Sequence, residues 1–155
     1  MRTLDRVVLE SRVFAGLEEG FAEQLAGCSQ TAGFQAGETL FREGEPADVF
    51  YMVRRGRVAL ELYVPGRGEL TIETIDAGSV VGWSWLFPPH VWHFDARAVA
   101  PVRAVAVDGA CIRGKCEEDP ALGYELMQRF SAVLLERLNA TRLRLADLYG
   151  GGHGS

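Results

Sequence analysis

Eight glycines between positions 33 and 82 separate short apolar runs, and this spacing constrains the fold more than any other feature of the chain. They stand at positions 33, 37, 44, 56, 66, 68, 78 and 82. Between them apolar and polar residues alternate, most clearly from Val58 to Leu62 and from Leu70 to Ile75. Short runs of period two that end at glycine-bearing turns are typical of strands in a β-sandwich or barrel. We therefore predict a mainly β region over about residues 30–107, with one face of each alternating strand turned inward.

Helical signals flank the predicted strands. Apolar residues about four apart predict a helix between Gly16 and Ala26. Asp119-Pro120 is a good helix start, and apolar residues three or four apart predict a helix from there over about residues 120–148. We expect a single domain over residues 1–149 and a flexible tail over residues 150–155.

The composition is that of an ordinary soluble globular protein, since 48% of the 155 residues are hydrophobic and 24% are charged. The formal net charge of −5 argues against non-specific nucleic-acid binding, which requires a basic face. No apolar stretch approaches the ~20 residues of a membrane helix, and the first ten residues lack a signal-peptide core. The odd number of cysteines (Cys28, Cys111 and Cys116) predicts reduced intracellular thiols. We expect a cytoplasmic protein without membrane association.

Several short motifs share their order and spacing with a known family. They are Val13-Phe14-Ala15-Gly16-Leu17, Gly37-Glu38, Glu43-Gly44, Ala47-Asp48, Phe50-Tyr51-Met52-Val53, Gly56, Val58, Gly78 and Gly82. In these residues the chain resembles the cyclic-nucleotide-binding domain family, with a β-roll of the catabolite-activator (Crp/Fnr-like) type. The resemblance covers about residues 10–145. It implies a double-stranded β-helix, or jelly roll, followed by a long helix, and a non-catalytic regulatory role.

The segment after Gly82 departs from that family at the phosphate-binding cassette. The family's cassette reads approximately G-E-L-A-L, some variable residues, then R-x-A; its Glu accepts the ribose 2′-hydroxyl and its Arg pairs with the cyclic phosphate. Here Trp83 stands in place of the Glu. Trp92 stands in place of the Arg when the register is counted back from Ala96-Arg97-Ala98, which leaves Arg97 in the following strand. The resemblance therefore implies that both polar anchors have been replaced.

All three tryptophans lie within ten residues, in the densest aromatic cluster of the chain. They either line an apolar pocket for a flat ligand or fill that pocket themselves. The candidate ligand-binding residues are Gly82, Trp83, Ser84, Trp85, Leu86, Trp92, His93, Phe94 and Arg97.

Two other ligand hypotheses stay open. A cyclic nucleotide could be held by Ser84, His93 and backbone amides, and a haem or redox-linked sensor could use His90 or His93. The two histidines have no carboxylate or thiolate at ligand spacing, so we predict no metal site. We find no catalytic triad or acid pair and expect no enzymatic activity. The sequence does not identify a cofactor.

The predicted C-terminal helix carries an apolar seam that indicates a homodimer, with a protein partner as the alternative. The seam consists of Met127, Phe130, Leu134, Leu138, Thr141, Leu145 and Leu148. We expect its start to pack on the β-roll and its later part to pack on another helix. The arginines at positions 129, 137, 142 and 144 alternate with acidic residues and are expected to form a solvated face. The chain ends soon after this helix, so we expect no direct DNA binding.

Overall fold

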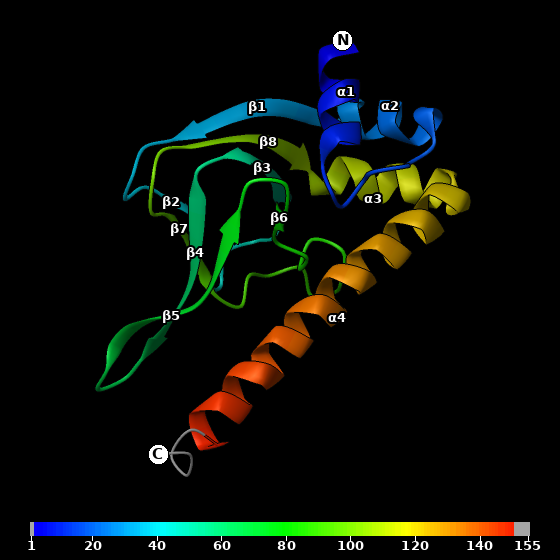
Figure 1. Cartoon of the computed structure of the whole chain (residues 1–155). Coiled ribbons are helices and arrows are strands. Elements are labelled where there is room, and N and C mark those ends of the chain that lie inside the picture. The colour runs from blue at the N-terminus through cyan, green and yellow to red at the C-terminus, as the bar shows by residue number, and fades with distance from the viewer. Residues whose placement is uncertain (1, 151–155) are drawn as a thin grey trace.

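Within residues 2–150, which the computed structural model describes, eight strands form two antiparallel sheets that wrap into a roll (Figure 1). One sheet has the order β1 (Ser29–Phe34), β8 (Val102–Asp108), β3 (Val49–Arg55), β6 (Val80–Val81). The other has the order β2 (Thr39–Phe41), β7 (Asp95–Ala98), β4 (Arg57–Val64), β5 (Gly68–Asp76). This confirms the mainly β region that the glycine spacing predicts and the jelly roll that the family resemblance implies. Of the flexible tail predicted at residues 150–155, residue 150 belongs to the last helix, and residues 151–155 lie outside the described residues.

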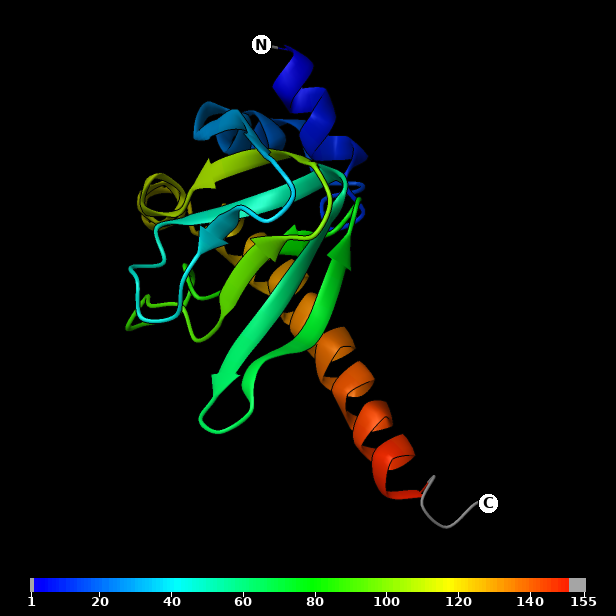
Figure 2. The ribbon, with the colours of Figure 1, turned by 90° about the vertical axis from the view of Figure 1, so that its left-hand side faces the viewer.

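Three short helices gather at one end of the roll, and a long helix runs along its side (Figures 1 and 2). The short helices are α1 (Arg2–Glu10), α2 (Glu19–Gly27) and α3 (Gly109–Glu118). The long helix, α4 (Pro120–Gly150), begins beside α3 and passes the roll diagonally, so that its last turns lie near the β4–β5 hairpin.

The side chains of β3 divide the interior into two apolar cores. Phe50 and Met52 face a core between the first sheet and the helices, whereas Tyr51 and Val53 face a core inside the roll. This follows from the alternation of side chains along a strand. The two cores bury most of the large apolar residues of the chain, and together they stabilise the roll and hold the helices against it.

Two details of the roll bear on the sequence pattern. Gly56 joins β3 to β4 with φ of +91°, and a side chain there would collide with the carbonyl oxygen of Pro101, so glycine is required.

The prediction that only one face of β4 turns inward is wrong, because Ala59 and Glu61 are buried as well as their neighbours. Glu61 is buried because Arg97 of β7 covers it and donates two hydrogen bonds to its carboxylate.

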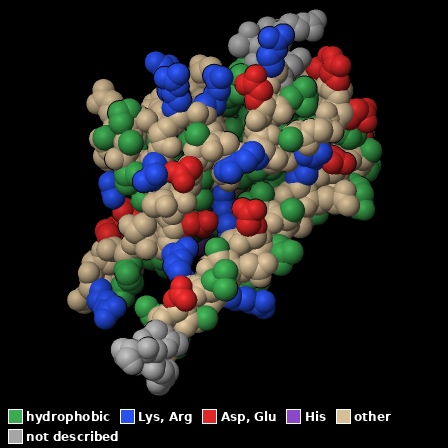
Figure 3. All heavy atoms as spheres, in the orientation of Figure 1, with side chains coloured by type: hydrophobic (Ala, Val, Ile, Leu, Met, Phe, Trp, Pro, Cys, Tyr) green, Lys and Arg blue, Asp and Glu red, His purple; other side chains and the backbone are tan. Residues whose placement is uncertain are grey.

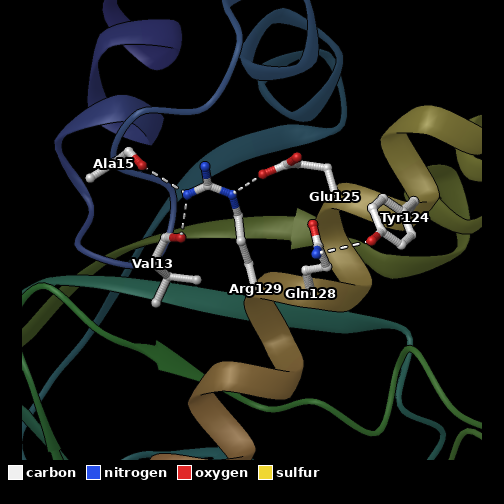
Figure 4. A network of polar contacts seen from close by, with 6 residues as sticks. All are labelled: Val13, Ala15, Tyr124, Glu125, Gln128 and Arg129. Atoms are coloured by element: carbon white, nitrogen blue, oxygen red, sulfur yellow. Dashed lines mark hydrogen bonds and ion pairs between the residues drawn. The ribbon is translucent and has the colours of Figure 1, made fainter.

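The first turns of α4 are fixed to the rest of the molecule by a polar clasp (Figure 4). Arg129 donates hydrogen bonds of 2.9 Å to the carbonyl oxygens of Val13 and Ala15, and its Nε lies 2.8 Å from Glu125. On the apolar side of the same turns Phe130 is fully buried. The orientation of α4 relative to the roll is therefore set by its first half.

The prediction of three reduced thiols is wrong for two of them, because Cys28 and Cys111 form a disulfide. They are 83 residues apart in the sequence, with Cα atoms 5.9 Å apart. Pairing of β1 with β8 brings them together, since Ser29 is opposite Val107 and α3 begins directly after β8. Cys116 is the free cysteine, and burial raises the pKa of its thiol. The cysteines therefore give no support to a reducing compartment.

Candidate ligand-binding site

A groove of about 720 Å³ lies between the β4–β5 hairpin and the second half of α4. Its walls are mainly aliphatic: Leu60, Leu70 and Ile72 come from the hairpin, and Leu134, Leu138, Leu145 and Leu148 come from α4. Trp83 and Phe94, from the segment between β6 and β7, also line it. Figure 3 shows apolar side chains on this side of α4, interspersed with charged ones. A groove of this size and composition is typical of a small-molecule site.

Arg137 of α4 is the most buried charged group of the groove, with only 9% of its side chain exposed. Its Nη2 donates to the carbonyl oxygen of Val80 and to the hydroxyl of Ser79. Its Nε lies 3.4 Å from a carboxylate oxygen of Glu73, and its guanidinium lies 5.2 Å from the centroid of the Trp83 ring. The remaining nitrogen, Nη1, is buried and has no hydrogen-bond partner.

Two further charged groups line the groove. Arg144 lies two turns after Arg137 on α4 and donates to the carbonyl oxygen of Ile72 in β5. Burial raises the pKa of Glu73, while Arg137 and Arg144 act in the opposite direction. Burial also lowers the pKa of Arg137, because the charged form loses hydration. The second half of α4 is thus held to the hairpin through arginine contacts at the groove.

Trp92 is buried inside the roll and does not line the groove. Its ring stacks on Phe41 at a centroid distance of 3.7 Å and an interplanar angle of 9°. Gly82 has φ of +100°, and a Cβ atom there would approach the Trp92 ring to 2.5 Å. The indole therefore fills the space in front of Gly82, so that any side chain at this position would collide with it.

The other two tryptophans lie in different surroundings. Trp85 is fully buried in the helix-side core, with ring centroids 4.8 Å from Phe50 and 5.2 Å from Phe130. Trp83 is partly buried, contacts both cores and lines the groove. The aromatic cluster in the sequence is therefore not a single pocket, and Trp83 and Phe94 are its members that line the groove.

The remaining predicted ligand-binding residues do not line the groove. Ser84 is buried, and Leu86 packs against the helix-side core. His93 is exposed. Arg97 is occupied by Glu61, with hydrogen bonds of 3.1 and 2.7 Å. Within residues 2–150 no three metal-binding side chains come together.

Comparison with known proteins agrees with the architecture. The family model "Cyclic nucleotide-binding domain" matches residues 32–119, which is more than half of the chain. The chain belongs to the cyclic nucleotide-binding domain family. Members of this family are non-catalytic regulators and sensors, so the expectation of a non-enzymatic domain is confirmed on that ground.

The relatives of this cyclic nucleotide-binding domain include whole regulators and isolated domains. It is 28% identical over 145 residues to the CRP-like cAMP-activated global transcriptional regulator of Mycobacterium tuberculosis, covering 94% of this chain and 63% of the regulator. It is 31% identical, with a TM-score of 0.78, to the structure of a protein from Geobacter metallireducens that is provisionally named a cyclic nucleotide-binding protein, covering 89% of this chain and 99% of that one. A cyclic nucleotide-binding domain from Methylobacillus flagellatus is 19% identical with a TM-score of 0.77 over 92% of this chain and 80% of that one, and shows the shared fold.

The sequence of this cyclic nucleotide-binding domain does not predict Arg137 and Arg144 at a ligand site, because their alternation with acidic residues favours a solvated face. That assignment is wrong for Arg137, which is buried at the groove, and for Arg129, which forms the clasp. One signal was present, because Arg137 lies three residues after Leu134 and four before Thr141 and thus shares their helical face. A charge on an apolar helical face is usually paired or functional.

The predicted dimer seam of the domain divides into two parts. Phe130 is fully buried within the subunit and has no surface left for a second helix. Four residues of the seam are exposed: Met127, Leu138, Leu145 and Leu148. Leu134 is partly buried, and the hydroxyl of Thr141 donates to the carbonyl oxygen of Arg137.

Among the helices described between residues 2 and 150, none is long and apolar enough to span a membrane.

Proposed function

We propose that this domain is a regulatory module whose groove between the β-roll and α4 binds a ligand other than cyclic AMP or cyclic GMP. The observation that carries the proposal is the position of Trp92. Its ring stacks on Phe41 inside the roll and lies against Gly82. The family resemblance places at position 92 the arginine that pairs with the cyclic phosphate. An indole offers no charge to a phosphate, and its volume occupies the space that the phosphate would need.

The loss of the charge partner can be expressed as an affinity. A charge-assisted hydrogen bond contributes about 1.5–3 kcal/mol, and its absence weakens binding roughly ten- to hundredfold. Trp83, in place of the ribose-binding glutamate, removes a second polar contact. The alternative, a nucleotide held by Ser84 and His93, gains no support because Ser84 is buried away from the groove and His93 is exposed.

The groove is suited to regulation because its two walls belong to different parts of the molecule. One wall is the β4–β5 hairpin and the other is the second half of α4, so a ligand in between contacts both. A ligand that prefers one relative position of the two walls would shift the populations of α4 positions. We propose that α4 passes this shift to a second copy of the chain or to a protein partner. A cytoplasmic location stays a prediction.

A thermal-shift titration with cyclic AMP and cyclic GMP tests the proposal. At roughly a thousandfold excess over Kd a ligand adds about 4 kcal/mol of stability. For a chain of this size that raises the midpoint of unfolding by about ten degrees, at ~2–4 °C per kcal/mol. We expect no such rise with either nucleotide at millimolar concentration, while the Mycobacterium tuberculosis cAMP-activated regulator serves as the positive control. A rise of several degrees would overturn the proposal.

A further inference from the structure

We propose that the ligand of this groove is an elongated hydrophobic monocarboxylate, whose carboxylate binds between Arg137 and Arg144 and whose apolar body lies along the leucines of α4. The inference rests on the proposed function, because it names the chemistry of the ligand for that groove. It follows from the length of the groove, from its charge and from one unpaired buried nitrogen.

The groove is long and apolar. It is lined by α4 from Leu134 to Leu148, which at 1.5 Å per residue is a distance of about 21 Å. Leu70 and Ile72 form the facing wall. A compact polar ligand would leave most of this surface in contact with water, whereas an extended apolar chain would cover it.

The charged groups that line the groove favour a single negative charge. Two guanidinium groups, of Arg137 and Arg144, and one carboxylate, of Glu73, leave a net charge of +1 on the lining. Glu73 forms an ion pair with Arg137 at 3.4 Å from Nε, which leaves one positive charge of the lining uncompensated. Glu136 acts on both groups of this pair from outside the groove lining.

The unpaired nitrogen is Nη1 of Arg137. A buried charged donor without an acceptor is unusual in proteins, and the other arginine of the same helix that is largely buried, Arg129, uses its Nη1 for two carbonyl oxygens (Figure 4). Arg137 lines the groove but Nη1 has no accessible surface there, so a carboxylate in the groove would supply the missing acceptor once the guanidinium turns towards it. Arg137 would then share its Nε between the ligand and Glu73, and Arg144 would share its Nη1 between the ligand and the carbonyl oxygen of Ile72.

A second copy of α4 is the main competing occupant. Its leucines would cover the apolar walls, but they provide no acceptor for Nη1 of Arg137. A carboxylate with an alkyl chain satisfies both requirements, and we therefore assign the groove to the carboxylate and leave the second copy as an outcome of the test.

The test compares dodecanoate with dodecan-1-ol, which has the same chain and no charge, by isothermal titration calorimetry of the full chain below micelle-forming concentrations. We expect dodecanoate to bind roughly ten- to hundredfold more tightly than the alcohol, as loss of a charge-assisted hydrogen bond predicts. Arg144→Gln should weaken dodecanoate binding at least fivefold and leave binding of the alcohol unchanged. Arg142→Gln is the matched control, because Arg142 is exposed on the same helix and does not line the groove.

The outcomes separate this inference from the proposed function. Equal affinity for the acid and the alcohol, or equal effects of Arg144→Gln and Arg142→Gln, overturns the inference that the ligand is a carboxylate. The proposed function, a groove that binds a ligand other than a cyclic nucleotide, is unaffected by that result. Failure of dodecanoate to bind, in a protein that light scattering shows to be a stable dimer, overturns the inference in favour of a second copy. Binding of cyclic AMP or cyclic GMP overturns the proposed function and this inference together. Arg137→Gln, checked for folding by circular dichroism, should reproduce the effect of Arg144→Gln.

Discussion

The two halves of α4 have the same backbone conformation and opposite relations to the rest of the molecule. In the first half Leu122, Leu126 and Phe130 are fully buried in the helix-side core. In the second half Leu138 and Leu148 are exposed by 50% and 73%, and the helix contacts the hairpin through arginines at the groove. The first half therefore builds the domain, whereas the second half forms one wall of a site and contacts the roll through Arg137 and Arg144.

The two buried arginines of the helix show the same difference. Arg129, in the first half, donates to two carbonyl oxygens and to Glu125. Arg137, in the second half, has a buried nitrogen without a partner, and its Nε lies 3.4 Å from the carboxylate of Glu73. An arginine whose nitrogens have hydrogen-bond acceptors within the protein fixes a helix, and one that lacks an acceptor has the capacity to bind a ligand.

The largest effect should come from the first half of the helix. Phe130→Ala removes a fully buried ring that contacts Phe14, Phe50 and Trp85, and should lower the free energy of unfolding by about 3–5 kcal/mol. Leu135→Ala is the matched control in the second half, because Leu135 is exposed, and should change it by less than about 0.5 kcal/mol. Urea denaturation measures both. Equal losses would mean that the two halves are packed alike.

A smaller loss should follow from the groove arginine. Arg137→Met keeps the apolar stem but removes the hydrogen bonds to Val80 and Ser79 and the partner of Glu73, which should cost about 1–3 kcal/mol. Adding Glu73→Gln to that variant should restore part of the loss, because the unpaired carboxylate is then removed. A double-mutant cycle by urea denaturation measures the coupling. Strict additivity would show that Arg137 and Glu73 act independently.

The fold could be predicted from the sequence because its signals are local. Each glycine marks a corner that a short strand cannot form otherwise, and Gly56 shows the reason, since a side chain there would collide with Pro101. Asp119-Pro120 likewise marks the start of α4 within a few residues. Gly82 and Trp92, which lie at the two ends of the cassette in the register of the family resemblance, are neighbours in space.

The site could be predicted only in part, because it depends on contacts between distant segments. The sequence placed three tryptophans in one cluster, but the roll separates Trp85 from Trp92 into different cores. Arg137 shares a helical face with Leu134 and Thr141, but no local signal shows that its side chain reaches Val80. The disulfide between Cys28 and Cys111 depends in the same way on the pairing of β1 with β8.

A pH-dependent effect should sharpen the difference between the clasp and the groove. Burial raises the pKa of Glu73 above its ordinary value of 4.5, so the folded protein binds this proton more tightly than the unfolded chain does. The contribution of Glu73 to stability is therefore fully present below pH 4.5 and is lost as the pH rises through the folded pKa. Urea denaturation should show the wild type gaining stability relative to Glu73→Gln as the pH is lowered from 7 towards 4.5. A constant or opposite difference would contradict the raised pKa.

The smallest change in subunit stability should come from the end of α4, where the same substitution tests the proposed dimer. Leu148→Glu alters a side chain that is 73% exposed, so the free energy of unfolding of the subunit should change by less than about 0.5 kcal/mol. If the seam joins two copies, the mass measured by light scattering should nevertheless fall from that of a dimer to that of a monomer, because a charge would be buried between the helices. Leu143→Glu is the control, since Leu143 is exposed to a similar extent but lies off the predicted seam and does not line the groove. Loss of the dimer in both variants, or in neither, would show that the seam does not join two copies. The second half of α4 would then serve as a wall of the ligand groove and not as a dimer contact.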